Sequence, residues 1–186
     1  PAGERPVRLP LGGRHNVSNA AGAAAAALAA GATLDDVVAG LAALRAVPGR
    51  LAVSETAGGA RVVDDSYNAN PASLHSAMAF VAAASGPAWL VLGDMQELGD
   101  GGREAHAEVG ERARQLGLAR VYAVGPLSRA AVEAFGDGAA WFATTDALIA
   151  ALRVDLAPGV TVLVKGSRAA RLGRVARALL ASDGEG

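Results

Sequence analysis

Six polar side chains follow a pair of valines within residues 62–71, and this short segment carries the densest chemistry of the chain. Polar groups just past the carboxyl end of a strand are where open α/β sheets bind ligands. An ionised carboxylate accepts two donors at once, so Asp65 is suited to a pair of ribose hydroxyls. The same pattern is typical of an Asx-rich turn in which Ser66 or Asn70 caps the next helix. Both interpretations stay open for the six residues, which are Asp64, Asp65, Ser66, Tyr67, Asn68 and Asn70.

A second cluster comprises Lys165, Ser167 and Arg168, where an apolar run over 160–164 gives way to a helical pattern over 168–180. Backbone N–H groups and the dipole at the start of a helix favour an anion, and these side chains would add charge-assisted donors. The alternative is a strand-to-helix turn with Ser167 as its cap. Lys165 is the only lysine and does not follow a glycine. The chain therefore holds no Walker A loop, whose lysine reaches the β and γ phosphates of a nucleotide.

Three further residues could contact a nucleotide. Asn16 and Asn19 stand beside His15 where the chain enters a helix, and an amide offers the donor and acceptor that an adenine edge needs. The alternative is a helix cap with its neighbour. Arg50 follows Pro48-Gly49, and a guanidinium can clamp phosphate oxygens bidentately. A solvated loop arginine is the alternative there.

No metal site is predicted. Asp94 and Glu97 are three residues apart and carry the oxygen ligands that Mg²⁺ prefers, but we expect them to bridge domains or to orient neighbouring loops. His106 is expected to be structural. No Gly-x-Gly-x-x-Gly fingerprint follows a strand, which argues against dinucleotide binding. Arginines recur every third residue from 168 to 177, as on a solvated helix face.

The apolar pattern predicts a Rossmann-like α/β domain over residues 48–186 and a helical unit over 1–47. In the helical unit, Asn16 or Ser18 would cap a helix that ends at Gly31, and Thr33 would cap a second one. Alternating strands and helices argue for a six-stranded, mostly parallel sheet with helices on both faces. The first two strands pair as a hairpin through Gly58-Gly59. Strands are expected at 51–56, 60–64, 89–92, 120–124, 139–142 and 160–164, and helices at 72–84, 101–116, 127–135, 145–152 and 168–180.

Composition excludes several classes of protein. Of the 186 residues, 52% are apolar, enough for a proper core, and the net charge is −1 without a dense basic block, which disfavours nucleic-acid binding. The absence of cysteine excludes disulfides and thiolate-bound metals. The apolar run over 20–30 is too short to span a membrane, and prolines interrupt any signal peptide. We expect a cytoplasmic monomer.

Five segments, in the same order along the chain, resemble the Mur ligase family, and specifically its branch that ligates D-alanyl-D-alanine. The resemblance extends from about residue 11 to residue 180. The matching segments are GRHNVSNAA at 13–21, VPGR at 47–50, DDSYNANP at 64–71, LGDMQELG at 92–99 followed by His106, and VKGSR at 164–168.

The resemblance implies an ATP-dependent amide ligase of peptidoglycan precursor synthesis, which adds D-alanyl-D-alanine to UDP-N-acetylmuramoyl-tripeptide through an acyl phosphate. It implies that Asn16 and Asn19 lie against adenine, that Arg50 reaches the nucleotide and that Asp65 binds its ribose. We expect the substrates to contact Ser66, Tyr67, Asn68, Asn70, Lys165, Ser167 and Arg168, the last three as candidate anchors of the dipeptide carboxylate.

The family binds ATP phosphates and Mg²⁺ in a central domain, whose C-terminal end residues 1–47 would form. We therefore expect the chain to be a C-terminal fragment that catalyses nothing alone and contains no certain catalytic residue. Two alternatives stay open. One is a ligase like folylpolyglutamate synthetase, which the sequence Tyr67-Asn68-Ala69-Asn70 disfavours. The other is a non-catalytic α/β binding module.

Overall fold

The computed structural model describes residues 3–45 and 47–181, apart from the side chains of Arg14 and His15. Contacts within the chain divide it into two compact units, Pro1–Val47 and Pro48–Gly186. Each unit is described by itself. No helix in the described part of the chain is both long and apolar enough to cross a bilayer.

The first unit contains two helices, α1 (Arg14–Ala29) and α2 (Leu34–Ala42). The first helix begins earlier than predicted, because Gly13 takes the N-cap position without any side-chain cap. The predicted stop is confirmed: Gly31 has a φ of 94°, a conformation open to glycine at a helix end. Thr33 caps α2, and the Asp36 side chain bonds back to the Thr33 N–H to complete a capping box.

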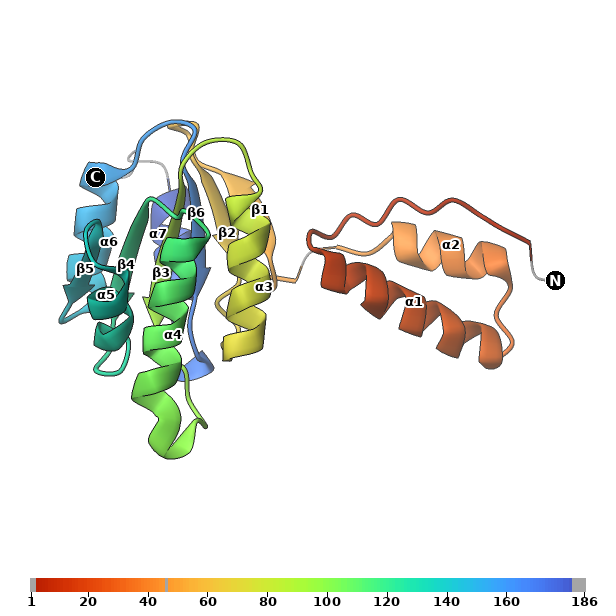
Figure 1. The fold of residues 1–186 in the computed structure, drawn as a ribbon. Helices are drawn as coiled ribbons and strands as arrows, with labels where there is room; N and C mark the ends of the chain where they lie inside the picture. The colour runs from red at the N-terminus through yellow and green to blue at the C-terminus, as the bar shows by residue number, and fades with distance from the viewer. Residues whose placement is uncertain (1–2, 46, 182–186) are drawn as a thin grey trace. The chain divides into compact units, whose positions relative to one another are not determined.

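The second unit is built on the predicted six-stranded sheet, whose strand order is β1-β2-β6-β3-β4-β5 (Figure 1). The first two strands pair antiparallel, as the hairpin signal indicated, and all other neighbours are parallel. The strands are β1 (Ala52–Glu55), β2 (Arg61–Asp64), β3 (Ala88–Gly93), β4 (Arg120–Val124), β5 (Ala139–Phe142) and β6 (Thr161–Lys165).

Helices cover both faces of this sheet (Figure 1). Along β3 the side chains alternate, with Leu90 and Leu92 packed towards α3, α4 and α5 and Trp89 and Val91 packed towards α6 and α7. All four are 5% exposed or less. Burial on both faces explains why the central strands are continuous apolar runs. The covering helices are α3 (Pro71–Ala82), α4 (Gly102–Gln115), α5 (Arg129–Phe135), α6 (Thr145–Asp155) and α7 (Gly173–Leu180).

The prediction of one continuous helix over 168–180 is wrong. A short 3₁₀ turn, Arg168–Ala170, follows β6, and Arg171 then adopts a left-handed φ of 50° before α7 begins at Gly173. The reversal lets the fully buried Leu172 reach the strand ends, where a Cβ on Gly166 would stand 3.0 Å from its Cδ1. The predicted anion site therefore lacks the helix start on which its dipole argument rested. The predicted arginines are exposed, but they do not form one helix face, because only Arg174 and Arg177 lie in α7.

The strand order creates a switch point between β6 and β3. The chain leaves β3 towards α4 on one face, whereas it leaves β6 towards α7 on the other face. Ligands of open α/β sheets bind outside the carboxyl ends of strands at such a point. The carboxyl ends of β2, β6 and β3 lie side by side, so the segments at 65–70, 165–168 and 94–96 are brought to one edge of the sheet.

Candidate functional site

The register of β2 against β6 brings Asp65 and Lys165 together across 100 residues of sequence. Asp64 pairs with Val164, and the Asp65 N–H donates to the Val164 carbonyl at 2.9 Å. The next residues of both strands then form an ion pair between the Lys165 ammonium and the Asp65 carboxylate. Their side chains are 3% and 12% exposed. A buried pair thus stands at the carboxyl edge of the sheet.

The other Asp65 oxygen accepts the Leu51 N–H at 3.1 Å, which ties the start of the unit to this edge. One residue earlier, the Arg50 guanidinium lies over the Tyr67 ring at 4.2 Å from its centroid. The Gly49 carbonyl accepts the Tyr67 N–H at 3.0 Å. Arg50 and Asp65, both predicted nucleotide contacts, are therefore held side by side on the same edge.

Several polar groups of the 65–70 turn are engaged in the turn itself. Asn70 caps α3, where its Oδ1 accepts the Ser73 N–H at 2.8 Å, so the capping alternative is confirmed for this residue. The Ser66 hydroxyl donates to Asp64 Oδ1 at 2.6 Å. Asn68 Oδ1 accepts the Ala69 N–H at 2.9 Å. Tyr67 is 47% exposed and leaves its hydroxyl without a hydrogen bond in the described structure. Roles of these residues in substrate binding stay predictions.

Lys165 has partners other than the predicted substrate carboxylate. Besides the Asp65 carboxylate, its ammonium donates to the Asn68 carbonyl at 3.0 Å and approaches the Asp65 carbonyl at 3.5 Å. An ammonium has three donors, and all three are directed at protein oxygens. This geometry disfavours Lys165 as a direct anchor of the dipeptide. Arg168 is exposed, and its predicted contact with substrate stays a prediction.

A pocket of about 230 Å³ opens at the switch point between β6 and β3. Ser167 is among the lining residues, and its buried hydroxyl has no hydrogen-bond partner among the described residues. Buried hydroxyls are rarely left without a partner, so this one is a candidate for bonding a ligand. The sequence analysis missed Gln96, Gly125 and Thr145 here, although a polar residue after a central strand could have indicated Gln96. The lining residues are Asp94, Gln96, Val124, Gly125, Thr145, Ser167, Ala169 and Ala170.

Asp94 orients a neighbouring loop, as predicted. Its carboxylate accepts the N–H groups of Ser128 at 2.7 Å and Leu127 at 3.3 Å, and its carbonyl accepts the Ser167 N–H at 3.0 Å. Glu97 is exposed and adopts a left-handed φ of 63°. No cluster of three potential metal ligands occurs in the described ranges.

His106 is structural, as predicted, although α4 buries it completely. Its Nε2 accepts the Met95 N–H at 2.9 Å, and its Nδ1 stands 2.6 Å from the Gly102 carbonyl. The neutral imidazole that donates from Nδ1 satisfies both contacts. His106 therefore fixes the backbone that follows β3 and, through it, one side of the pocket.

Asn16 and Asn19 lie in the first unit. Asn16 Nδ2 donates to the Gly12 carbonyl at 2.6 Å, and Asn19 Nδ2 reaches Asn16 Oδ1 at 3.4 Å. Asn16 is half-buried inside the first turn of α1 rather than at its cap. Contact of either amide with adenine stays a prediction, and the His15 side chain lies outside the described part of the chain.

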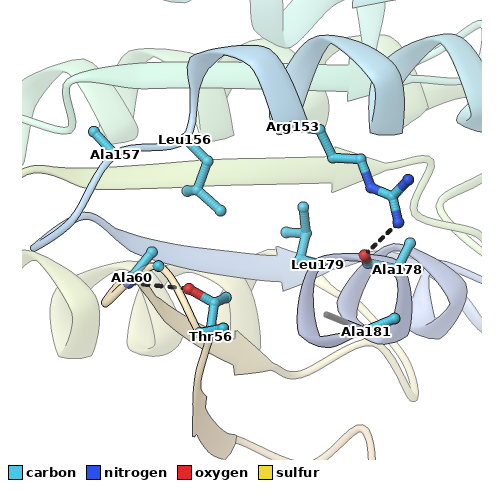
Figure 2. Close-up of a pocket in the computed structure, with 10 residues that line it drawn as sticks. Thr56, Ala60, Arg153, Leu156, Ala157, Ala178, Leu179 and Ala181 are labelled. Carbon is cyan, nitrogen blue, oxygen red and sulfur yellow. Dashed lines mark hydrogen bonds between the residues drawn. The ribbon is translucent and has the colours of Figure 1, made fainter. Parts of the chain in front are cut away.

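A second pocket, of about 170 Å³, lies between the β1–β2 turn and the C-terminal ends of α6 and α7 (Figure 2). Its polar groups are paired within the protein: Arg153 donates to the Ala178 carbonyl at 2.9 Å, and Thr56 Oγ1 accepts the Ala60 N–H at 3.1 Å. It lies beside the amino ends of β2 and β6, away from the polar segments. We find no ligand chemistry there.

The one large pKa shift among the described residues lies elsewhere, on β4. Burial raises the pKa of Tyr122 to about 12, helped by the hydrogen bond that its hydroxyl donates to Asp155. Tyr122 also stacks on Phe142 with ring centroids 5.9 Å apart, inside the core facing α6 and α7. This phenol therefore supports the core and takes no part in the candidate site.

Comparison with known proteins places these features in a family. Residues 49–168 match the family described as Mur ligase, glutamate ligase domain. The chain is 47% identical over 181 residues to the UDP-N-acetylmuramoyl-tripeptide--D-alanyl-D-alanine ligase of Escherichia coli (strain K12), which covers 96% of this chain and 40% of that ligase. It thus spans about two fifths of the length of the curated relatives it matches.

Two solved structures are similar over nearly the whole chain. MurF from Acinetobacter baumannii matches with a TM-score of 0.87 and 34% identity, over 97% of this chain and 41% of that one. MurF from Thermotoga maritima, solved in complex with ADP, matches with a TM-score of 0.81 and 29% identity, over 93% and 40% of the two chains.

Proposed function

This chain belongs to the Mur ligase family, and on that premise we propose that it is the C-terminal part of an ATP-dependent ligase joining D-alanyl-D-alanine to UDP-N-acetylmuramoyl-tripeptide. The observation that carries the proposal is the convergence of Arg50, Asp65 and the Ser167 pocket at one sheet edge. This arrangement suits a domain that contacts a nucleotide with one part of the sheet edge and an amine substrate with the adjacent part.

The nucleotide side consists of Arg50 and Asp65. Asp65 uses one lone pair of each oxygen for Leu51 and Lys165, and an ionised carboxylate has about four acceptor sites. Acceptors therefore stay available for two ribose hydroxyls. Arg50 is exposed and braced by the Tyr67 ring, so its guanidinium is free to clamp phosphate oxygens. Asn16 and Asn19 would supply the adenine contacts.

The amine side is the pocket at the switch point. D-alanyl-D-alanine ends in a carboxylate, and the Ser167 hydroxyl is a buried donor without a partner in the described structure. We assign the carboxylate to this hydroxyl, with Gln96 and Thr145 as further polar neighbours. The dipeptide amine would then point out of the pocket, towards the acyl group presented by the rest of the ligase.

The reaction itself needs mainly positioning and charge neutralisation. The tripeptide carboxylate attacks the γ-phosphorus of ATP and ADP leaves. The amine of D-alanyl-D-alanine then attacks the acyl carbon, loses a proton and expels phosphate, which forms the amide. The described residues contain no cluster that fits Mg²⁺, so we derive no step through this metal. In this proposal the described residues bind and orient the substrates, and none of them is assigned a reacting group.

A substrate panel on the full-length ligase tests the proposal. ATP, UDP-N-acetylmuramoyl-tripeptide and D-alanyl-D-alanine should together release phosphate and yield the extended precursor. Replacing the dipeptide with glutamate, or omitting the tripeptide, should reduce phosphate release to background. Efficient ligation of glutamate would instead favour a folylpolyglutamate synthetase-like activity, and no ATP turnover with any substrate would favour a binding module. The 186-residue chain alone is expected to be inactive.

Ser167→Ala should raise the KM for D-alanyl-D-alanine about tenfold or more, since a hydrogen bond to a charged group is worth about 1.5–3 kcal/mol. The KM for ATP should not change, and stability should not fall, because the hydroxyl has no protein partner to lose. Steady-state kinetics and a thermal melt measure both. Ser76→Ala, at an exposed serine of α3, is the matched control. An unchanged dipeptide KM would remove Ser167 from the site.

A further inference from the structure

Lys165 is the most deeply buried charged side chain at the site edge, and the proposed reaction gives it no substrate contact. It stands at the carboxyl end of β6, between the turn that carries Asp65 and the pocket lined by Ser167. Its ammonium is already directed at three protein oxygens, which leaves no donor for a dipeptide carboxylate. A buried ammonium persists only when it is paired and hydrogen-bonded, so its function must lie in the groups it contacts.

Those groups determine where the Asp65 carboxylate points. One oxygen is fixed by the Leu51 N–H and the other by the Lys165 ammonium, so rotation about the side chain is blocked from both sides. The same ammonium holds the Asn68 carbonyl at 3.0 Å, three residues further along the turn. The turn also carries Tyr67, on which Arg50 stacks. One lysine thereby fixes both predicted nucleotide contacts.

We propose that Lys165 is a positioning residue for nucleotide binding, which locks the Asp65 carboxylate and the 65–68 turn so that the free acceptor sites of Asp65 face the ribose. This inference rests on the proposed function, since it assumes that Asp65 binds the nucleotide. It replaces the expectation that Lys165 anchors the dipeptide. Lys165 instead affects ATP binding indirectly, by holding Asp65 in place.

The test is a double-mutant cycle in the full-length ligase, with the KM values for ATP and for D-alanyl-D-alanine as readouts. Lys165→Met should raise the KM for ATP between about ten- and a hundredfold, the effect of misplacing a binding group or removing its support. The KM for the dipeptide should stay within about twofold, as expected for a residue without substrate contact. Lys165→Arg, which keeps the charge, should recover part of the loss.

The cycle separates this role from a general loss of structure. If Lys165 acts through Asp65, Asp65→Asn combined with Lys165→Met should show the same KM for ATP as Asp65→Asn alone. If Lys165→Met by itself fails to fold, Lys165→Arg carries the test, because it keeps a cation beside Asp65 and should still raise the KM for ATP more than the KM for the dipeptide. Tryptophan fluorescence melts verify folding of every variant.

Three results would refute the proposal. One is a double variant whose KM for ATP is the product of the two single effects. Another is a Lys165→Met variant that raises only the dipeptide KM and no longer distinguishes D-alanyl-D-alanine from its C-terminal amide, which would restore the carboxylate anchor. The third is a wild-type ligase without activity on these substrates, which would refute the proposed function and this inference with it.

Discussion

Asp65→Ala is expected to lower the free energy of unfolding of the second unit by about 3–5 kcal/mol, the usual cost of breaking one side of a buried ion pair. The truncation leaves the Lys165 ammonium buried without its counter-ion and takes the acceptor from the Leu51 N–H. Urea unfolding followed by tryptophan fluorescence measures this unit alone, because both tryptophans, Trp89 and Trp141, lie in it.

The same pair predicts strong non-additivity. Lys165→Met alone should cost a similar amount, whereas Asp65→Asn with Lys165→Met should recover most of the stability, because a neutral pair leaves no buried charge. Asp146→Ala is the matched control. It breaks the Arg174–Asp146 pair, whose side chains are 44% and 83% exposed, and should cost under about 1 kcal/mol. A cost for Asp65→Ala no larger than this control would contradict the expectation.

The secondary structure of the second unit was predictable because its signals are local. Apolar runs such as 89–92 and 160–164 mark strands buried on both faces, and glycines mark the turns between elements. In the first unit, Thr33 predicted a helix start and Gly31 a helix end for the same reason. The start of α1 was missed, because Gly13 provides no side-chain signal that competes with the asparagines after it.

The partners of the site residues were not predictable, because they depend on register. Lys165 and Asp65 are 100 residues apart in sequence and meet only because β6 pairs with β2 in one particular alignment. The sequence showed a lone lysine before a polar turn, for which an outside carboxylate was a reasonable partner. For Asn70 the two interpretations, helix cap or ligand contact, differ only in where the side-chain amide points. In the structure its Oδ1 accepts the Ser73 N–H, so it is a cap.

The break in the chain before α7 could also not be predicted from the spacing of apolar residues. The apolar spacing over 168–180 suits one helix, yet the chain must turn from β6 onto the other face of the sheet and bury Leu172 against Gly93 and Gly166. That packing favours a left-handed Arg171, a conformation uncommon outside glycine. Close contacts between distant segments thus override the local preference for helix.

A second large effect on stability is expected at Gly110, where α4 contacts α5. Gly110→Ala should destabilise the second unit by about 3 kcal/mol, the upper range for an overpacked core. A Cβ at this position would stand 2.1 Å from the Ala131 carbonyl oxygen and 2.8 Å from its Cα. Both contacts are with backbone, so relief requires α5 to move away from α4 rather than a side chain to rotate.

Gly101→Ala, at the start of the same helix, is the matched control for Gly110→Ala. An added Cβ there meets nothing within 4 Å, and its φ of −81° is allowed for alanine, so the change should cost under about 1 kcal/mol. Urea unfolding with tryptophan fluorescence compares the two variants in the same unit.

Movement of α5 would also shift Ser128, whose N–H the Asp94 carboxylate holds beside the switch-point pocket. Gly110→Ala should therefore weaken dipeptide binding in the full-length ligase as well, and equal stabilities of the two variants would show that α4 and α5 do not rely on this close approach.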